Sequence, residues 1–122
     1  MSKAYVQWLE QGQRDFEVAQ LLIQEGSLSH AAFFLEQAVE KTLKARLIWL
    51  GEGLRHTHQC GELALAADLP RNLVEKASTF STYYVATRYP DTEMEEITDE
   101  DIDWLTTNAE KILVWIEKSL EN

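Results

Sequence analysis

Apolar residues recur with a helical period along four long stretches of the chain. The most apolar stretch runs from Ser29 to Leu50 and contains neither glycine nor proline. Apart from Arg46, its charged and amide side chains fall on one arc of roughly 140° of a helical wheel, and nearly all the others are apolar. A helix that is apolar over more than half of its circumference needs partners on several sides. The pattern therefore predicts a central helix over residues 29–50, in the middle of a helical bundle.

Three residues of this central stretch fall on unexpected faces. Arg46 lies within the apolar sector, where a charge is costly unless it is paired, so we expect an internal partner for it. Phe33 and Ile48 lie within the polar arc and favour a partner on this side of the helix as well. We interpret the polar arc chiefly as a solvated face, with an interface as the alternative. Its members are Glu36, Gln37, Glu40, Lys41 and Lys44.

A first helix is predicted over residues 3–25 and ends at Gly26, a residue suited to the left-handed position after a helix. The turn to the central helix is short, so the two helices should form an antiparallel hairpin. Asp15 falls inside the apolar arc of the first helix, where a carboxylate needs a partner. Arg46 is the natural candidate, and Lys41 is the alternative.

The second half of the chain predicts one short and two long helices. The polar, glycine-bearing loop after residue 51 precedes a short helix over 63–69, and a long helix follows over 70–88. Thr98 and the acidic residues after it are typical of a helix start, and the last helix should reach residue 120. No stretch alternates as a strand does. The fold class predicted is all-α, an up-and-down four-helix bundle with an additional short helix.

Composition narrows the class of protein. The chain has 122 residues, which fits a single domain over residues 1–122, and Cys60 is its only cysteine, so it has no internal disulfide. Its formal net charge of −10 argues against general nucleic-acid binding. It has no apolar run long enough to cross a membrane, and we expect a cytoplasmic protein with no membrane partner. Trp104 and Trp115 fall off the core face of the last helix and predict a second contact surface, most simply that of a homodimer.

The candidate ligand site lies where the helix over 70–88 ends. Arg88 and Tyr89 precede Pro90, which turns the chain, and Asp91 follows. An arginine fork can hold a phosphate in a bidentate way, or it can form an ion pair with Asp91 or Asp15. The central helix could bring Gln37 or Lys41 to the same cleft. The predicted ligand-binding set is Arg88, Tyr89, Asp91, Tyr84, Lys41, Gln37 and His58.

No metal site, cofactor or catalytic group is predicted. His56, His58 and Cys60 have the pattern H-x-H-x-C, which is not a zinc-finger spacing, and glycines occur nearby in the loop. His58 is expected to cap or orient this loop. The chain also contains no glycine-rich phosphate loop and no nucleophile motif.

Four blocks of residues together resemble the HEPN domains, named for their occurrence in higher eukaryotes and prokaryotes. They are W-L-x(4)-R-D-F at 8–16, A-A-F-F-L-E-Q-A-V-E-K-T-L-K-A at 31–45, T-H at 57–58 and Y-Y-V-A-T-R-Y-P-D at 83–91. The resemblance implies a helical bundle similar to the helical domain of certain nucleotidyltransferases. Small members of the family often pair as homodimers and are encoded beside a minimal nucleotidyltransferase, and some are ribonucleases or toxins.

The ribonuclease members carry an arginine followed, after four to six residues, by a histidine. In this chain Arg88 is followed by Y-P-D-T-E-M-E-E-I-T, which contains no histidine, so the ribonuclease motif is incomplete. The resemblance therefore implies a homodimeric module that binds a nucleotide or a nucleotidyltransferase partner. The alternatives are a ribonuclease or toxin-like protein with a degenerate motif, as in toxin–antitoxin pairs, and a scaffold that binds only protein.

Overall fold

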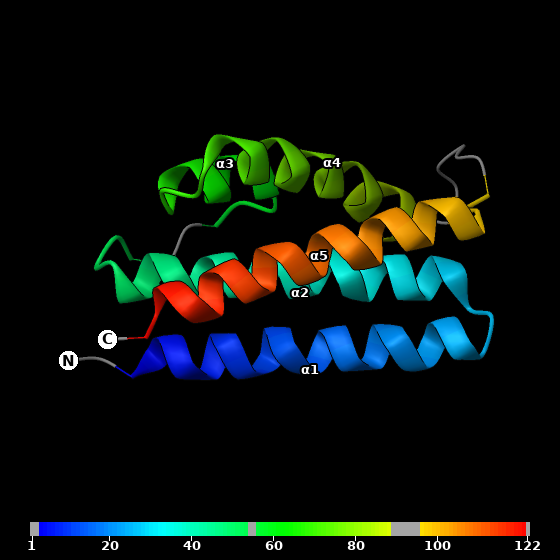
Figure 1. The fold of residues 1–122 in the computed structure, drawn as a ribbon, viewed down its shortest axis with the longest axis horizontal. Coiled ribbons are helices and arrows are strands. Elements are labelled where there is room, and N and C mark those ends of the chain that lie inside the picture. The colour runs from blue at the N-terminus through cyan, green and yellow to red at the C-terminus, as the bar shows by residue number, and fades with distance from the viewer. Residues whose placement is uncertain (1–2, 54–55, 89–95, 122) are drawn as a thin grey trace.

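The fold consists of four long helices and one short helix in a computed structural model that describes residues 3–53, 56–88 and 96–121. The helices are α1 (Ala4–Gln24), α2 (Leu28–Trp49), α3 (Cys60–Ala66), α4 (Arg71–Arg88) and α5 (Asp99–Ser119) (Figure 1). The described residues form no strand. The predicted all-α fold with an additional short helix is therefore confirmed, although the short helix begins three residues earlier than expected.

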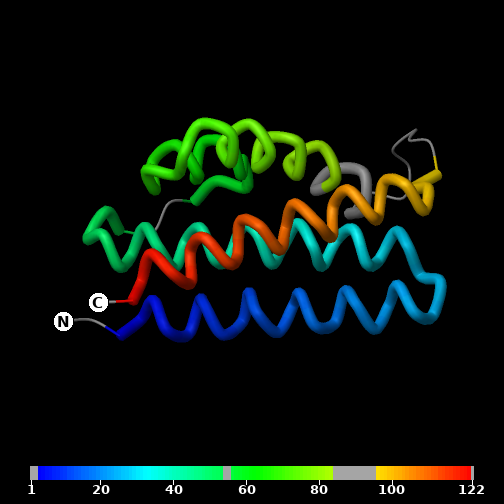
Figure 2. Tube along the Cα trace, in the orientation of Figure 1, coloured from blue at the N-terminus to red at the C-terminus, as the bar shows by residue number. Residues whose placement is uncertain are grey.

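Helix α2 is the centre of the arrangement, since it packs against each of the other four helices. Helices α1 and α2 run antiparallel, and α5 lies over α2 between α1 on one side and the α3–α4 pair on the other (Figure 1). The Cα trace shows the same order, with α3 and α4 forming a separate upper layer (Figure 2). This layout explains the broad apolar sector of α2, because a helix covered on several sides needs apolar residues on most of its surface.

Short local signals set where the helices begin and end. Gly26 adopts a φ of 79°, the left-handed conformation that reverses the chain between α1 and α2. At the start of α5, the Thr98 hydroxyl accepts a hydrogen bond from the Asp101 backbone N–H at 3.1 Å. The Asp101 carboxylate accepts one in return from the Thr98 N–H at 2.9 Å. This capping box satisfies two backbone donors that the helix cannot pair itself.

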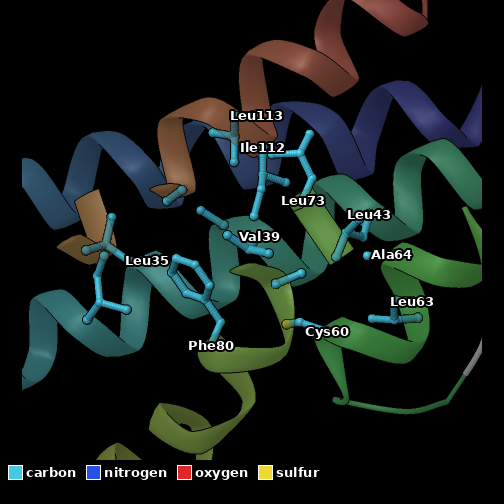
Figure 3. Packing of buried hydrophobic residues seen from close by; sticks show 14 of the residues in the cluster. Leu35, Val39, Leu43, Cys60, Leu63, Ala64, Leu73, Phe80, Ile112 and Leu113 are labelled. Carbon is cyan, nitrogen blue, oxygen red and sulfur yellow. The ribbon is translucent and has the colours of Figure 1, made fainter. Parts of the chain in front are cut away.

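The core follows one side of α2. Leu35, Val39 and Leu43 are fully buried, and Phe80 and Ile112 close over them from α4 and α5 (Figure 3). Beside this core, Gly12 lets α1 approach α2 so closely that a Cβ atom there would lie 2.5 Å from the Cγ2 atom of Thr42. The contact between Gly12 and Thr42 therefore sets the register of the α1–α2 hairpin.

This register corrects the expected partner of Asp15. The Asp15 Oδ2 atom pairs with the Lys41 Nζ atom at 2.8 Å, so Lys41 is the partner and the preferred pairing with Arg46 is wrong. Because Gly12 lies against Thr42 in an antiparallel hairpin, Asp15 lies opposite Val39. Arg46 is then seven residues further along α2, about 10 Å away.

Arg46 instead holds three segments of the fold together. Its Nε atom donates a hydrogen bond to the Ala67 carbonyl at 2.7 Å. Its guanidinium lies 5.7 Å from the ring centre of Trp49 and 4.9 Å from that of Trp115. Burial lowers the pKa of Arg46, and the nearby Asp68 carboxylate opposes that shift. The internal partners of this charge are thus a carbonyl and two indole rings.

Candidate functional site

Much of the predicted ligand site lies outside the described residues. Arg88 is the last residue of α4. Tyr89 and Asp91 are not among the described residues, and neither are the side chains of Tyr84 and Arg88. The phosphate-binding role expected for this end of α4 stays a prediction.

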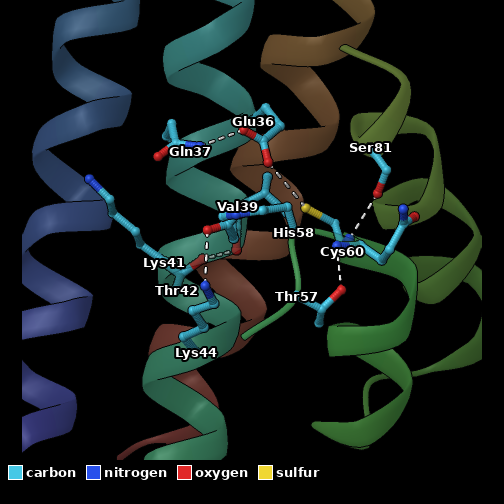
Figure 4. A network of polar contacts seen from close by, with 12 residues as sticks. Glu36, Gln37, Val39, Lys41, Thr42, Lys44, Thr57, His58, Cys60 and Ser81 are labelled. Carbon is cyan, nitrogen blue, oxygen red and sulfur yellow. Dashed lines mark hydrogen bonds and ion pairs between the residues drawn. The ribbon is translucent and has the colours of Figure 1, made fainter. Parts of the chain in front are cut away.

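The structure places Gln37 and Lys41 on the side of α2 that faces α1. The Gln37 amide donates a hydrogen bond to the Glu36 carboxylate at 2.7 Å (Figure 4). Lys41 pairs with Asp15. Both side chains therefore already have acidic partners inside the protein. A ligand at this position would have to compete with Glu36 and Asp15.

His58 belongs to a polar network on the other side of α2 (Figure 4). Its Nδ1 atom lies 2.9 Å from one carboxylate oxygen of Glu40, whose other oxygen accepts a hydrogen bond from Lys44 at 3.1 Å. The Cys60 thiol donates to the Glu36 carboxylate across 3.8 Å. Burial raises the pKa of the Cys60 thiol well above its ordinary value, and the Glu36 and Glu40 carboxylates raise it further. The thiol therefore stays protonated and is a poor nucleophile.

This network overturns the interpretation of the polar arc as a solvated face. Glu36, Gln37, Glu40 and Lys44 are all buried, with Glu36 completely so. The reason is that α1 covers one edge of the arc, while the segment 56–66 folds back over the other. Burial of these groups is tolerable because each has a hydrogen-bonding partner. Among the described residues, no three His, Cys, Asp or Glu side chains are arranged to hold a metal ion.

A groove of about 690 Å³ lies between the first turn of α4 and the second half of α5. Leu73, Val114 and Trp115 supply apolar surface, and Lys111 and Lys118 line it from α5. Trp115 is half-buried, because the Arg46 guanidinium stacks on its ring from the protein interior. The indole is therefore held in place from behind, and its remaining surface contributes to the groove.

The groove is locally basic although the chain is acidic. Lys76 on α4 lies beside Lys111, and partial desolvation together with the neighbouring Lys111 ammonium lowers the pKa of Lys76. Within the described part of the chain, no carboxylate lies at ion-pair distance from Lys76, Lys111 or Lys118. One carboxylate, that of Glu110, also lines the groove. Two ammonium groups, those of Lys111 and Lys118, thus line one groove in a chain with a net charge of −10.

Comparison with known proteins identifies the family. The family model of the HEPN domain matches residues 5–119. This chain belongs to the HEPN domain family.

Two solved structures resemble this HEPN domain over nearly its whole length. The crystal structure of TT1696 from Thermus thermophilus is 30% identical, with a TM-score of 0.86, and the match covers 96% of this chain and 98% of that one. ST0689, described as an archaeal HEPN homologue, is 27% identical, with a TM-score of 0.82 and coverage of 98% and 100%. No curated protein matches the chain significantly. In the described part of this HEPN domain, no helix is both long enough and apolar enough to cross a membrane.

The basic groove of this HEPN domain was not predicted from the sequence. Lys111, Trp115 and Lys118 recur at spacings of four and three, which places them on one face of α5. That signal was present, but Leu73 joins the groove only through the packing of α4 against α5. The groove also lies at the opposite end of α4 from Arg88, about 25 Å away along an 18-residue helix.

Proposed function

We propose that this HEPN domain is a non-catalytic module that binds a nucleotide in the groove between α4 and α5. The observation that carries the proposal is that an indole ring and two lysines line one groove in an otherwise acidic protein. The groove volume of about 690 Å³ lies within the range of roughly 300–1,000 Å³ that is common for small-molecule sites. A nucleotide combines the two features that such a groove can recognise, a flat aromatic base and a charged phosphate.

Each part of the groove has a role in this proposal. The Lys111 and Lys118 ammonium groups attract phosphate oxygens, and they are free to do so because no described carboxylate neutralises them. Trp115 offers apolar ring surface to the base, and stacking of this kind contributes about 1–3 kcal/mol per base in nucleic-acid complexes. Arg46 keeps the ring in one orientation, which lowers the entropy lost on binding.

The net charge favours a small anion over a long nucleic acid. A chain of charge −10 repels a polyanion over most of its surface, whereas a single nucleotide meets only the local field of the groove. The ribonuclease or toxin-like alternative predicts cleavage of RNA by the purified protein, lost on Arg88→Ala. We favour the binding module because the arginine–histidine motif is incomplete.

A homodimer and a separately encoded nucleotidyltransferase partner belong to the same proposal. Trp104 on α5 and Leu21 on α1 are large apolar side chains that are 39% and 58% exposed. Apolar side chains exposed in this way are suited to an interface. Sedimentation at micromolar concentration should give a dimer, and a monomer would remove this part of the proposal. A protein-binding scaffold without any ligand is the alternative that the next experiment tests.

Thermal shift and calorimetry with nucleoside mono-, di- and triphosphates test the binding function. A ligand that binds only the folded state must raise Tm. We expect Lys111→Glu to abolish the shift and Arg14→Glu to retain it. The two variants change the net charge equally, and the Arg14 side chain is 71% exposed on α1, with Glu17 as its ion-pair partner at 3.3 Å. If no nucleotide raises Tm, or if both variants respond alike, the groove is not a nucleotide site.

A further inference from the structure

Helix α5 forms a ridge between two grooves on one face of the protein, with α1 on one side and α4 on the other (Figure 1). The basic groove lies between α5 and α4, and a second groove of about 300 Å³ lies between α5 and α1. Glu110 and Val114 line both grooves, so they belong to the ridge that separates them. The Val114 side chain is apolar and 40% exposed. The ridge therefore keeps apolar surface in contact with water.

The two sides of this ridge carry opposite charges. Lys111 and Lys118 line only the basic groove, on the α4 side. Glu117 lines only the second groove, on the α1 side, and Glu17 lines that groove from α1. Glu110 and Glu117 are seven residues apart, as are Lys111 and Lys118, and each glutamate directly precedes a lysine. Seven residues are close to two helical turns, so each repeated charge keeps to its own side of α5.

These charges are not neutralised within the described part of the chain. None of the four side chains of Glu110, Lys111, Glu117 and Lys118 forms an ion pair with a described residue. The Gln13 amide on α1 donates a hydrogen bond to the Glu117 carboxylate at 2.6 Å, which holds that carboxylate on the α1 side. The face thus presents an acidic row and a basic row on either side of an apolar residue.

A two-fold axis parallel to α5 pairs the two rows between two copies of the chain. Such an axis lays both α5 helices along each other in the same direction and turns the lysine side of each toward the glutamate side of the other. Height along the helix is preserved, so Lys111 lies level with Glu110 of the second copy to within about 1.5 Å. Lys118 and Glu117 match in the same way. An axis across α5 would instead place lysine against lysine, so the charge pattern favours the parallel arrangement.

We propose that a second copy of the chain docks on this face of α5, which gives the homodimer of the proposed function its interface. The two Val114 side chains meet at the centre, and Glu110 and Glu117 of each copy pair with Lys111 and Lys118 of the other. The same lysines are the phosphate-attracting groups of the basic groove. The dimer therefore closes the groove, and nucleotide binding and dimerisation oppose each other.

Sedimentation of charge variants of the full chain tests this interface. Lys111→Glu places a carboxylate against Glu110 of the second copy, and Glu110→Lys places an ammonium group against Lys111. Each variant should weaken the dimer at least about tenfold, because the two-fold axis repeats every like-charge contact. An equimolar mixture of the two variants should recover the wild-type affinity, since every charge in the mixed dimer faces its opposite. Both side chains are exposed, and circular dichroism checks that both variants keep their helices.

Two controls separate the contact from the net charge. Arg71→Glu changes the net charge as Lys111→Glu does, and the Arg71 side chain is 95% exposed and lines neither groove. This variant should dimerise like the wild type. The double variant Glu110→Lys with Lys111→Glu keeps the wild-type net charge and restores both contacts. It should form a homodimer by itself but should not pair with the wild-type chain.

The outcomes separate this inference from the proposed function. A dimer that Lys111→Glu does not weaken, or a mixture no tighter than its two components, overturns the α5 interface and leaves the homodimer itself standing. Equal weakening by Arg71→Glu also overturns it. Adenosine 5′-monophosphate should lower the dimer fraction, and binding without that effect would show that the groove is not the interface. A wild-type chain that is monomeric at micromolar concentration overturns both the interface and the homodimer, whereas nucleotide binding is decided by the thermal shift.

Discussion

Removal of the Asp15 carboxylate should destabilise the hairpin of α1 and α2. Its Oδ2 atom lies 2.8 Å from the Lys41 Nζ atom, and the two side chains are 12% and 22% exposed. Breaking a fully buried ion pair costs about 3–5 kcal/mol, whereas exposed pairs contribute about 1 kcal/mol or less. Because Lys41 keeps some contact with water, Asp15→Ala should lower the free energy of unfolding by about 2–3 kcal/mol.

Urea unfolding followed by circular dichroism measures this change. The expected loss is a large fraction of the roughly 5–15 kcal/mol that stabilises a typical domain, so the midpoint should fall clearly with little change in slope. Most of the cost comes from the ammonium group left without a partner. The double variant Asp15→Leu with Lys41→Met should therefore recover most of the stability.

A double-mutant cycle tests whether the charges at positions 15 and 41 interact. Replacing both charges should give a coupling energy of at least about 1 kcal/mol between positions 15 and 41. A loss below about 0.5 kcal/mol for Asp15→Ala would show that the carboxylate is solvated. Additive effects in the double variant would show that the two residues do not interact, and the hairpin register set by Gly12 would then be wrong.

Two further predictions concern buried positions. Gly12→Ala should lower the urea midpoint, because overpacking against Thr42 costs about 1–3 kcal/mol and the gain in helix propensity returns only about 1 kcal/mol. Adding Thr42→Ser, which removes the Cγ2 atom, should restore part of the loss, and no restoration would contradict the close approach. The Cys60 thiol should resist alkylation in the folded protein, since its pKa is raised. The folded state therefore holds this proton after the unfolded state has lost it, so stability should fall as pH rises above about 8.5. Cys60→Ala should reduce this loss of stability at high pH. An unchanged pH profile of stability would contradict the raised pKa of Cys60.

The sequence determined the helices and their order. Periodic apolar residues located the four long helices within a few residues, because each helix must present an apolar face to the same core. Gly26 and Thr98 marked boundaries through local backbone chemistry that needs no distant partner. The HEPN resemblance rested on residues 8–16, 31–45, 57–58 and 83–91, and the family match over residues 5–119 confirmed it.

Only the tertiary structure decided what the polar side chains contact. A helical wheel shows that Glu36, Glu40 and Lys44 share a face, but it cannot show that the segment 56–66 covers that face. The partner of Asp15 depended on the register of two helices, which the close contact at Gly12 sets. The basic groove required α4 to pack beside α5, because Leu73 and Lys111, which both line it, are 38 residues apart in the chain. Local sequence encodes the period of each helix, whereas burial and charge pairing depend on neighbours that only the packed fold brings together.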